Sequence, residues 1–588
     1  MADNLNFGEY LDEIFADEDS DYEFEGFDLD DVNENPEVVI NERITNENWV
    51  AGEHVPLPLN FSGSQGFFRE INDKTSPIEY FENFINDQDI QEIVQETNLY
   101  AAQSIASKNV SAYSRFNKWI DTTLNEMRRF IALLFTMTLV CQLDISEYWT
   151  TDPVTSTPFF RDIMARNRLY LLLTFFHLNN NENNIPRGQD GHDPLFKLGT
   201  LYHNILHRFQ SYYYPGQNLT IDECMVPWRG NLSFKTYNPD KPSKYGLKAY
   251  MLCDSKNGFC SKFKLYTGKP LIPHSSNGAT YDLTMDLLRG HFGKGHILYC
   301  DNYYSSPQLF SDLWELGVGA TGTVRPNRKG VPDELKNLKL RAKGETAVVN
   351  KGPLNLTKYL DHKPVYMLST VSTSENIDTN RKDPWTGENI IRPKVVFEYN
   401  SKMGGVDRSD QMISYCKIPI KTLKWWKKVI FHMFSMAALN SYLIYKSTTT
   451  ERSPLLFRNY RRKLIKQLIE KSNDVGLHEA KKSAGRPSGK QLKRHFAEKI
   501  IPTGTKLNLT CRCIVCTPAE RELLASAGEK RRRPGRDTSF NCAECNVALC
   551  IDPCFKLYHK YKEYNLAYKR QKLAAEAARN VNENNTEE

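Results

Sequence analysis

Apolar residues at helical spacing dominate the segment between residues 77 and 217. Three stretches show the pattern: SPIEYFENFINDQDIQEIVQETNLYAAQ, LNEMRRFIALLFTMTLVC and MARNRLYLLLTFFHL. Apolar residues that recur every three to four positions form one stripe along a helix, and such a stripe packs against a core. The pattern therefore predicts a helical domain over residues 73–217.

From residue 218 to 324 the pattern changes to alternation of apolar and polar residues, with many β-branched and aromatic types. LKAYMLCDSKNGFCSKFKLYTG predicts a hairpin that turns at residues 256–258, GHILYC a buried strand, SPQLFSDLWEL a helix and GVGATGTV a further strand. Strand, hairpin, helix and strand in this order favour a ribonuclease-H-like α/β core over residues 218–326. The chain is then a multidomain α/β protein.

The remaining segments differ in composition from this core. Residues 327–393 are charged and mixed in pattern, the core pattern returns at 394–416, and helical periodicity returns at 417–500. A basic linker and a cysteine-rich segment fill residues 501–588. Residues 1–72 carry acidic runs with Asn, Gly and Pro and no sustained periodicity, so we expect disorder there, either as a solvating tail or as an acidic-hydrophobic interaction segment.

Three aspartates stand where an apolar segment gives way to a polar one: Asp222 in LTIDECMVPWRGN, Asp301 in GHILYCDNYYSSPQLF and Asp407 in YNSKMGGVDRSDQM. Asp410 follows one turn after Asp407 on a predicted helix. A lone aspartate after a strand more often caps a helix or begins a turn. Carboxylates gathered from separate elements, however, can hold two Mg²⁺ ions about 4 Å apart, which activate the attacking oxygen and stabilise the leaving oxygen of a phosphodiester. Glu223 points the other way in an extended strand, and we leave it out of this site.

The sequence motifs around these aspartates resemble those of a known family. IDECMVPWRG, YNPDKPSKYGLKAYMLCDSKNGF, CDNYYSSPQLF, GTVRPNRKG and GGVDRSDQM occur in this order, and RNRLYLLLTFFHLNNN lies upstream of them. Together they closely resemble the piggyBac family of DNA transposases, from about residue 76 to the C-terminal cysteine cluster.

The resemblance implies a role for each motif. Asp222, Asp301 and Asp407 match the catalytic aspartates and would bind two Mg²⁺ ions, with Asp410 as a weaker fourth position. Residues 327–393 would be an insertion domain, and 417–500 would fold beside 73–217 as a discontinuous dimerisation and DNA-binding domain. Lys421, Thr422 and Trp425 fall where the family has residues near the DNA end. The family also implies excision through hairpin ends, insertion at TTAA and a homodimer on the terminal inverted repeats.

Charge supports a polyanionic partner. The net charge is +5, but residues 1 to 42 hold 16 acidic residues and no Lys or Arg, which leaves about +21 (+5 plus 16) for the rest of the chain. Residues 417–500 contain 20 Lys or Arg against five acids. We expect phosphate contacts there, with Lys421, Lys424, Lys427 and Lys428 contributing to the salt dependence of DNA binding.

Two further basic clusters bear on location. KKSAGRPSGKQLKR, which includes Arg486, combines a bipartite nuclear-localisation pattern with a partial minor-groove hook, and EKRRRPGR is a second cluster; solvated linker charge is the alternative for both. We expect a nuclear protein. No apolar stretch of 18 or more residues occurs in the sequence, and no membrane association is expected.

Seven of the 13 cysteines lie between residues 511 and 554. Cys513 with Cys516 and Cys542 with Cys545 form two Cys-x-x-Cys pairs, and Cys550, Cys554 and His559 follow. This spacing predicts tetrahedral zinc sites rather than disulfides, and two ions would need eight ligands. The eighth ligand is Cys511 or His495, and we assign Cys511. By resemblance the module is a cross-brace zinc finger that binds transposon-end DNA; from the residues alone it fits a protein partner equally well.

Three functions fit this sequence. The first is an active cut-and-paste transposase, which the intact aspartates favour. The second is a domesticated derivative that binds DNA without catalysis. The third, a metal-dependent nuclease of another pathway, is disfavoured because the shared motifs extend far beyond the site.

Overall fold

A computed structural model describes residues 49–107, 114–239, 244–268, 274–382, 387, 389–473, 495–500, 510–528, 534–542, 545–561 and 563–584. The chain divides into two compact units, 1–477 and 478–588. The acidic residues 1–42, the segment 481–494 and most of EKRRRPGR lie outside the described residues.

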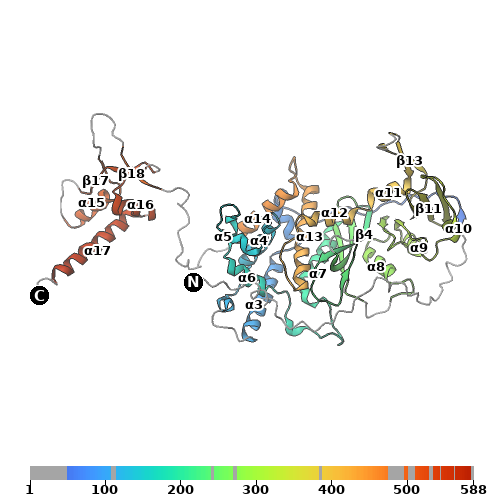
Figure 1. The fold of residues 1–588 in the computed structure, drawn as a ribbon, viewed down its shortest axis with the longest axis horizontal. Helices are drawn as coiled ribbons and strands as arrows, with labels where there is room; N and C mark the ends of the chain where they lie inside the picture. Colours follow the sequence, from blue (N-terminus) through green and yellow to red (C-terminus); the bar gives the residue numbers. More distant parts are fainter. Residues whose placement is uncertain are drawn as a thin grey trace. The chain divides into compact units, whose positions relative to one another are not determined.

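Unit 1 is built on a mixed sheet that has ten strands within the described residues (Figure 1). β4 and β8 are parallel, as are β8 and β9, and every other pair in the sheet is antiparallel. In order across the sheet the strands are β1 (Val50–Ala51), β10 (Thr346–Lys351), β11 (Leu354–Leu360), β12 (Pro364–Ser369), β9 (Gly319–Thr323), β8 (Ile297–Cys300), β4 (Asn218–Pro227), β6 (Tyr245–Asp254) and β5 (Lys235–Tyr237), with β7 (Cys260–Leu265) also paired to β6.

The two faces of this sheet belong to different cores. On one face, Leu219 and Ile221 of β4 pack with α8 (Ala279–Leu288) and α9 (Pro307–Glu315). On the other face, Cys224 and Val226 join the core of the helical assembly. This division follows from the strand itself, because successive side chains point to opposite faces.

The helical assembly joins segments that are far apart in sequence. Its main helices are α2 (Pro77–Glu82), α3 (Asp87–Ser107), α4 (Leu124–Met137), α5 (Pro158–Ile163), α6 (Arg166–Phe175), α7 (Gly199–Tyr212), α13 (Trp425–Thr448) and α14 (Phe457–Asn473). Gln467 of α14 accepts a hydrogen bond from the backbone N–H of Ile78 (3.1 Å), and Arg129 of α4 donates to Ser472 (3.1 Å). The predicted early and late helical segments therefore pack together.

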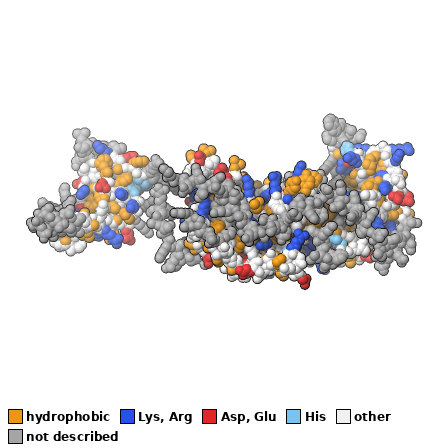
Figure 2. All heavy atoms as spheres, turned by 60° about the horizontal axis from the view of Figure 1, so that its bottom comes forward, with side chains coloured by type: hydrophobic (Ala, Val, Ile, Leu, Met, Phe, Trp, Pro, Cys, Tyr) orange, Lys and Arg blue, Asp and Glu red, His pale blue; other side chains and the backbone are white. Residues whose placement is uncertain are grey.

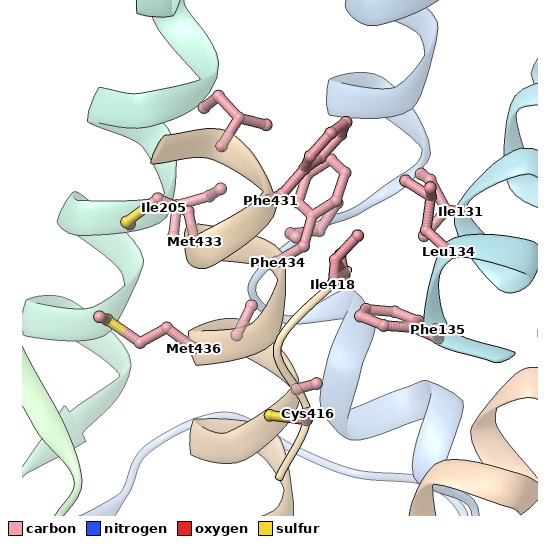
Figure 3. Close-up of a cluster of buried hydrophobic side chains, with 14 of the residues drawn as sticks. Ile131, Leu134, Phe135, Ile205, Cys416, Ile418, Phe431, Met433, Phe434 and Met436 are labelled. Carbon is pink, nitrogen blue, oxygen red and sulfur yellow. The ribbon is translucent and has the colours of Figure 1, made fainter. Parts of the chain in front are cut away.

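α13 runs through the centre of this assembly. Figure 3 shows Phe431 and Phe434 of α13 among side chains of α4 and α7, with the segment that carries Cys416 and Ile418 beside the helix. Almost every residue of α13 between Val429 and Tyr445 is buried, which explains why its apolar residues show no single stripe.

Three smaller helices and a hairpin also belong to unit 1. α11 (Lys394–Lys402) and α12 (Gly405–Ser414) follow the two-stranded sheet of β13 (Asn376–Lys382) and β14 (Asn389–Pro393), and α10 (Asp333–Asn337) precedes β10. Strands β10, β11 and β12 come from the charged segment predicted as an insertion. They extend the same sheet through β12 and β9, where Met367 pairs with Thr323.

Unit 2 is small and has little regular structure. It contains β15 (Ala497–Lys499), β16 (Cys511–Arg512), α15 (Cys516–Ser526), β17 (Asp537–Thr538), β18 (Phe540–Cys542), β19 (Val547–Ala548), a π-helical turn at Ile551–Phe555, α16 (Lys556–Lys560) and α17 (Tyr564–Asn584). Four of its nine buried core residues are cysteines, so its apolar core is minor. Across the described part of the chain, no helix is both long and apolar enough to traverse a bilayer.

Candidate active site and metal-binding module

Asp222 and Asp301 lie next to each other on neighbouring parallel strands. The last paired residues of β4 and β8 are Ile221 and Cys300, and each aspartate is the next residue along its strand. Parallel neighbours are about 4.8 Å apart, and laterally paired residues project to the same face. The two aspartates therefore arise at one edge of the sheet, at the ends of neighbouring strands.

α12 brings Asp407 to the face of β4 that carries Asp222. The helix packs on β4 and β6, and its first residue, Gly405, lies so close to β4 that a Cβ atom there would be 2.7 Å from Oγ1 of Thr220. Thr220 is on the same face of β4 as Asp222, and its hydroxyl donates to the carbonyl of Lys402 (3.2 Å). Asp407 is in the first turn of this helix and is exposed.

Asp410, one turn further, lies beside Cys253 of β6. Burial and, as a smaller cause, the Asp410 carboxylate raise the pKa of the Cys253 thiol. Since Cys253 pairs with Thr220 in the sheet, Asp410 faces the strands at a level two residues before Asp222.

Asp301 is held by its own loop. Its Oδ1 accepts a hydrogen bond from the backbone N–H of Tyr303 (2.9 Å), and its carbonyl accepts from the hydroxyl of Ser305 (2.9 Å). Burial, followed by repulsion from Glu223, raises the pKa of this carboxyl, although hydrogen bonds from the loop act in the opposite direction. Arg328 donates to the carbonyls of Asn302 (2.6 Å) and Tyr303 (3.0 Å) and fixes the loop from the outside.

Glu223 is a residue that sequence reasoning left out. It faces away from α12, as predicted, but Tyr304 donates a hydrogen bond to its Oε2 (3.2 Å), and Nζ of Lys248 lies 3.9 Å from its Oε1. Glu223 thus ties the strand of Asp222 to the loop of Asp301. Its position directly after Asp222, with two tyrosines following Asp301, is the signal that sequence analysis could have used.

The chemistry of these donors fits hard divalent cations. Carboxylate oxygens are the ligands that Mg²⁺ prefers, and the half-buried, mutually repelling charges of Asp301 and Glu223 would gain from a cation. Among the described residues, the carboxylate oxygens of Asp222, Asp301 and Asp407 do not form a cluster in which all lie within 4.8 Å of one another. A site with two ions about 3.5–4 Å apart spreads its ligands more widely than a single ion does.

The segment before α13 holds the residues predicted to contact DNA. Lys421 is exposed, and Thr422 accepts a hydrogen bond from the backbone N–H of Lys424 (3.1 Å), which shapes the turn into the helix. Trp425 is half-buried and packs edge-to-face on Phe234, with ring centres 5.4 Å apart. Figure 2 shows Lys and Arg side chains spread along unit 1 among acidic and uncharged ones.

The next residues of α13 point into the protein. Trp426 is 5% exposed and stacks on Phe176. Lys427 donates to the carbonyls of Leu173 (2.7 Å) and Thr174 (3.1 Å) at the end of α6, and Lys428 donates to the carbonyl of Ile420. The predicted lysines therefore differ: Lys421 is exposed, whereas the ammonium groups of Lys427 and Lys428 already bind backbone carbonyls, and their part in DNA binding stays a prediction.

Unit 2 contains two groups of four donor atoms, each within 4.8 Å of one another: Cys513, Cys516, Cys550 and Cys554 in one, and His495, Cys542, Cys545 and His559 in the other. Their ligands alternate along the chain in the cross-brace manner. In the second group Nδ1 of His495 is 3.3 Å from Sγ of Cys542 and 3.4 Å from Sγ of Cys545. Tetrahedral zinc with bonds of about 2.0–2.3 Å separates its ligands by about 3.3–3.8 Å. Both groups could hold zinc.

Neighbouring groups orient these ligands. Nδ1 of His559 donates to the carbonyl of Phe555 (2.7 Å), which leaves Nε2 for a metal, 3.7 Å from Sγ of Cys545. Burial raises the pKa of Cys550 to about 12, with the crowding of Cys513 and Cys516 as smaller causes. A divalent cation would offset that crowding by stabilising thiolates.

The assignment of Cys511 as the eighth ligand does not fit this geometry. Cys511 lies in β16, where it pairs with Thr538, and belongs to neither group. His495 takes the eighth position instead, because β15 pairs with β18 and brings Ala497 opposite Cys542.

Comparison with known proteins gives this site a family. A family model described as Transposase IS4 matches residues 76–442, more than half of the chain. The relatives of this chain and its structural neighbour are of the piggyBac type. The chain belongs to the piggyBac-type transposases. The predicted family is confirmed.

Two human relatives are similar over most of this piggyBac-type chain. PiggyBac transposable element-derived protein 3 of Homo sapiens is 24% identical over 497 residues, which cover 82% of this chain and 76% of the relative. PiggyBac transposable element-derived protein 2 of Homo sapiens is 26% identical over 400 residues, 66% of this chain and 64% of the relative. A cryo-EM structure of the piggyBac transposase synaptic complex with hairpin DNA matches with a TM-score of 0.60 and 27% identity, over 70% of this chain and 83% of that one.

Proposed function

We propose that this chain is a cut-and-paste DNA transposase whose strand cleavage and joining occur at Asp222, Asp301 and Asp407. The observation that carries the proposal is the meeting of three elements: Asp222 and Asp301 follow the last paired residues of two parallel strands, and Gly405 lets α12, with Asp407, pack on the face of β4 that carries Asp222. Order and pairing of β4, β6, β7, β8 and β9 support a ribonuclease-H-like core.

The chain's own residues would hold and shape the site. Asp222, Asp301 and Asp407 would bind two Mg²⁺ ions, with Asp410 as a further ligand or a partner for a neighbouring side chain. When bound, such ions activate the attacking oxygen and stabilise the leaving oxygen, so one site can serve both water and a DNA 3′-hydroxyl. Tyr304 and Glu223 would hold the Asp301 loop against β4 during both steps.

The other parts of the chain would recognise DNA. We infer that unit 2 binds two structural zinc ions and contacts the transposon ends, while Lys421, Thr422, Lys424 and Trp425 lie near the DNA end. A tryptophan that is half-exposed can stack on an unpaired base for about 1–3 kcal/mol. The family membership supports a homodimer on terminal inverted repeats, hairpin ends, TTAA insertion and a nuclear location.

A second candidate is a domesticated protein that binds DNA without cleaving it. The names of the human relatives, which call them transposable element-derived, favour this alternative. The intact Asp222, Asp301 and Asp407 favour the transposase, because a protein that only binds DNA has no need of these carboxylates.

Incubation of the full chain with a donor duplex tests the two functions. The duplex carries the inverted repeats, bounded by TTAA, that flank the coding sequence in its genome, and Mg²⁺ is added last. The transposase proposal expects a hairpin-capped transposon fragment and a rejoined donor. Saturable binding without cleavage in Mg²⁺ or Mn²⁺ would instead establish the domesticated alternative.

A further inference from the structure

A small cavity of about 20 Å³ lies between the end of β4 and α13. Val226 and Pro227 line it on one side, Lys417 and Ile418 on another, and Lys428, His432 and Ser435 of α13 on the third. The three α13 residues stand four and three positions apart, so they share one face of the helix. The volume is enough for about one water-sized group.

Three basic groups converge on this cavity, and none of the residues that line it is acidic. Burial and, as a smaller cause, the charge of Lys417 lower the pKa of Lys428 to about 8 and that of His432 to about 4. Nε2 of His432 is buried and has no hydrogen-bond partner within the described residues. The cavity therefore holds positive charge and a polar atom that the protein itself does not satisfy.

The walls of the cavity are fixed by short-range bonds. Ser435 donates to the carbonyl of Cys416 (2.8 Å), and Lys428 donates to the carbonyl of Ile420, so both ends of the segment that carries Lys417 and Ile418 are attached to α13. Figure 3 shows this segment running beside the helix. An ammonium group has three N–H donors, so Lys428 can bond a further acceptor.

The cavity lies on the side of the sheet that carries Asp222 and α12. Val226 is four residues after Asp222 on β4, and alternation places both on one face. At a rise of about 3.4 Å per residue they are about 14 Å apart along the strand. A DNA strand that reaches Asp222 would pass within a few nucleotides of the cavity.

We propose that Lys417, Lys428 and His432 bind one phosphodiester of the DNA strand that enters the catalytic site, with one non-bridging oxygen inserted in the cavity. This site rests on the proposed transposase function. A phosphodiester carries one negative charge and oxygen atoms that accept hydrogen bonds, and the three basic side chains have no such partner among the other residues that line the cavity. Because the cavity lies beside β4 four residues beyond Asp222, this contact would fix the position of the DNA strand along the site rather than read its base sequence.

Lys417 is the residue to change, because it is exposed and its loss leaves the core intact. Binding of the full chain to the transposon-end duplex is measured at several salt concentrations without a divalent metal. Lys417→Gln should lower the slope of log affinity against log salt by about 0.9, the value of one phosphate contact. Lys417→Arg should restore the slope, and Lys363→Gln, at an exposed lysine between β11 and β12, should leave it unchanged.

A scan of the duplex locates the contact. One phosphate at a time is replaced by an uncharged methylphosphonate. At one position near the cleavage site this substitution should weaken DNA binding by the unchanged chain. At the same position it should not weaken binding by Lys417→Gln any further. Additive losses at every position would overturn the proposal. Inorganic phosphate is the second probe. If phosphate stabilises the chain and Lys417→Gln abolishes that effect while the salt slope of DNA binding stays unchanged, the cavity binds a free anion. That result would overturn the DNA assignment. A chain that binds no duplex at all would refute the proposed function itself.

Discussion

The contact between α12 and β4 gives a sharp prediction about catalysis. In Gly405→Ala the new Cβ would lie 2.7 Å from Oγ1 of Thr220 and 3.2 Å from the carbonyl oxygen of Asp254. Thr220 cannot turn away cheaply, because it is fully buried and its hydroxyl is bonded to Lys402 and Ser255. The start of α12 must therefore move away from the sheet.

The size of the movement follows from the contact. Ordinary contacts begin at 3.4 Å, so the helix must shift by about 0.7 Å (3.4 minus 2.7), and Asp407, two residues on, moves with it. A misplacement of about 1 Å at a catalytic site can cost about 100-fold in rate, so we expect cleavage to fall roughly 10- to 100-fold. Overpacking should also lower stability by about 1–3 kcal/mol.

Gly404→Ala is the matched control. A Cβ there meets nothing within 4 Å, and the backbone at φ −75° suits any residue. We expect a change in stability of no more than about 1 kcal/mol in either direction and unchanged cleavage. Single-turnover cleavage of transposon-end DNA, DNA affinity and thermal denaturation are measured for both variants. Equal cleavage rates for Gly405→Ala and Gly404→Ala would refute the role of this close approach in placing Asp407.

Further predictions concern zinc, DNA and the Asp301 loop. The full chain purified under reducing conditions should contain two zinc ions by elemental analysis. Cys511→Ser should keep both ions and His495→Ala should keep one, because His495 lies within ligand distance of Cys542 and Cys511 belongs to neither group of ligands. Changing Lys421 and Lys424 together to Gln should lower the salt slope of DNA binding by about 1.8, the sum of two phosphate contacts. Tyr304→Phe should raise the Mg²⁺ concentration for half-maximal cleavage about 10- to 100-fold, since loss of groups that orient metal ligands has that effect.

Each of these has an outcome that contradicts it. Loss of one zinc ion in Cys511→Ser would return the eighth position to that cysteine. An unchanged slope in the double lysine variant would place both side chains away from the DNA, and Lys427→Gln, which removes bonds to the end of α6, should lower stability instead. An unaltered Mg²⁺ requirement in Tyr304→Phe, with normal folding, would make its bond to Glu223 irrelevant to the site.

The pattern of the sequence was enough to predict local structure and the neighbourhood of the aspartates. The hairpin turn at residues 256–258 and the strand before Asp301 follow from alternation and turn residues, and β6, β7 and β8 confirm them. A strand end is a local property. That two such ends become neighbours follows from the parallel crossover between β4 and β8.

What failed depends on long-range packing. His495 is 47 residues before Cys542, so spacing could not rank it above Cys511, which is close to the other cysteines; the pairing of β15 with β18 decides the matter. The basic run from Lys421 to Lys428 does not reveal which ammonium groups bind the protein; only the positions of α6 and of the 417–420 segment give Lys427 and Lys428 their carbonyl partners.

Cleavage by aspartate variants tests the central claim most directly. Asp222→Asn, Asp301→Asn and Asp407→Asn each remove a carboxylate with little change in volume, and Asp190→Asn, at an exposed loop position, is the control. With transposon-end DNA and Mg²⁺, each of the three should bind DNA normally and cleave at less than about one hundredth of the unchanged rate, since even groups behind the ligands are worth 10- to 100-fold. The control should cleave normally. Near-normal cleavage by any of the three would remove that aspartate from the site and contradict the account.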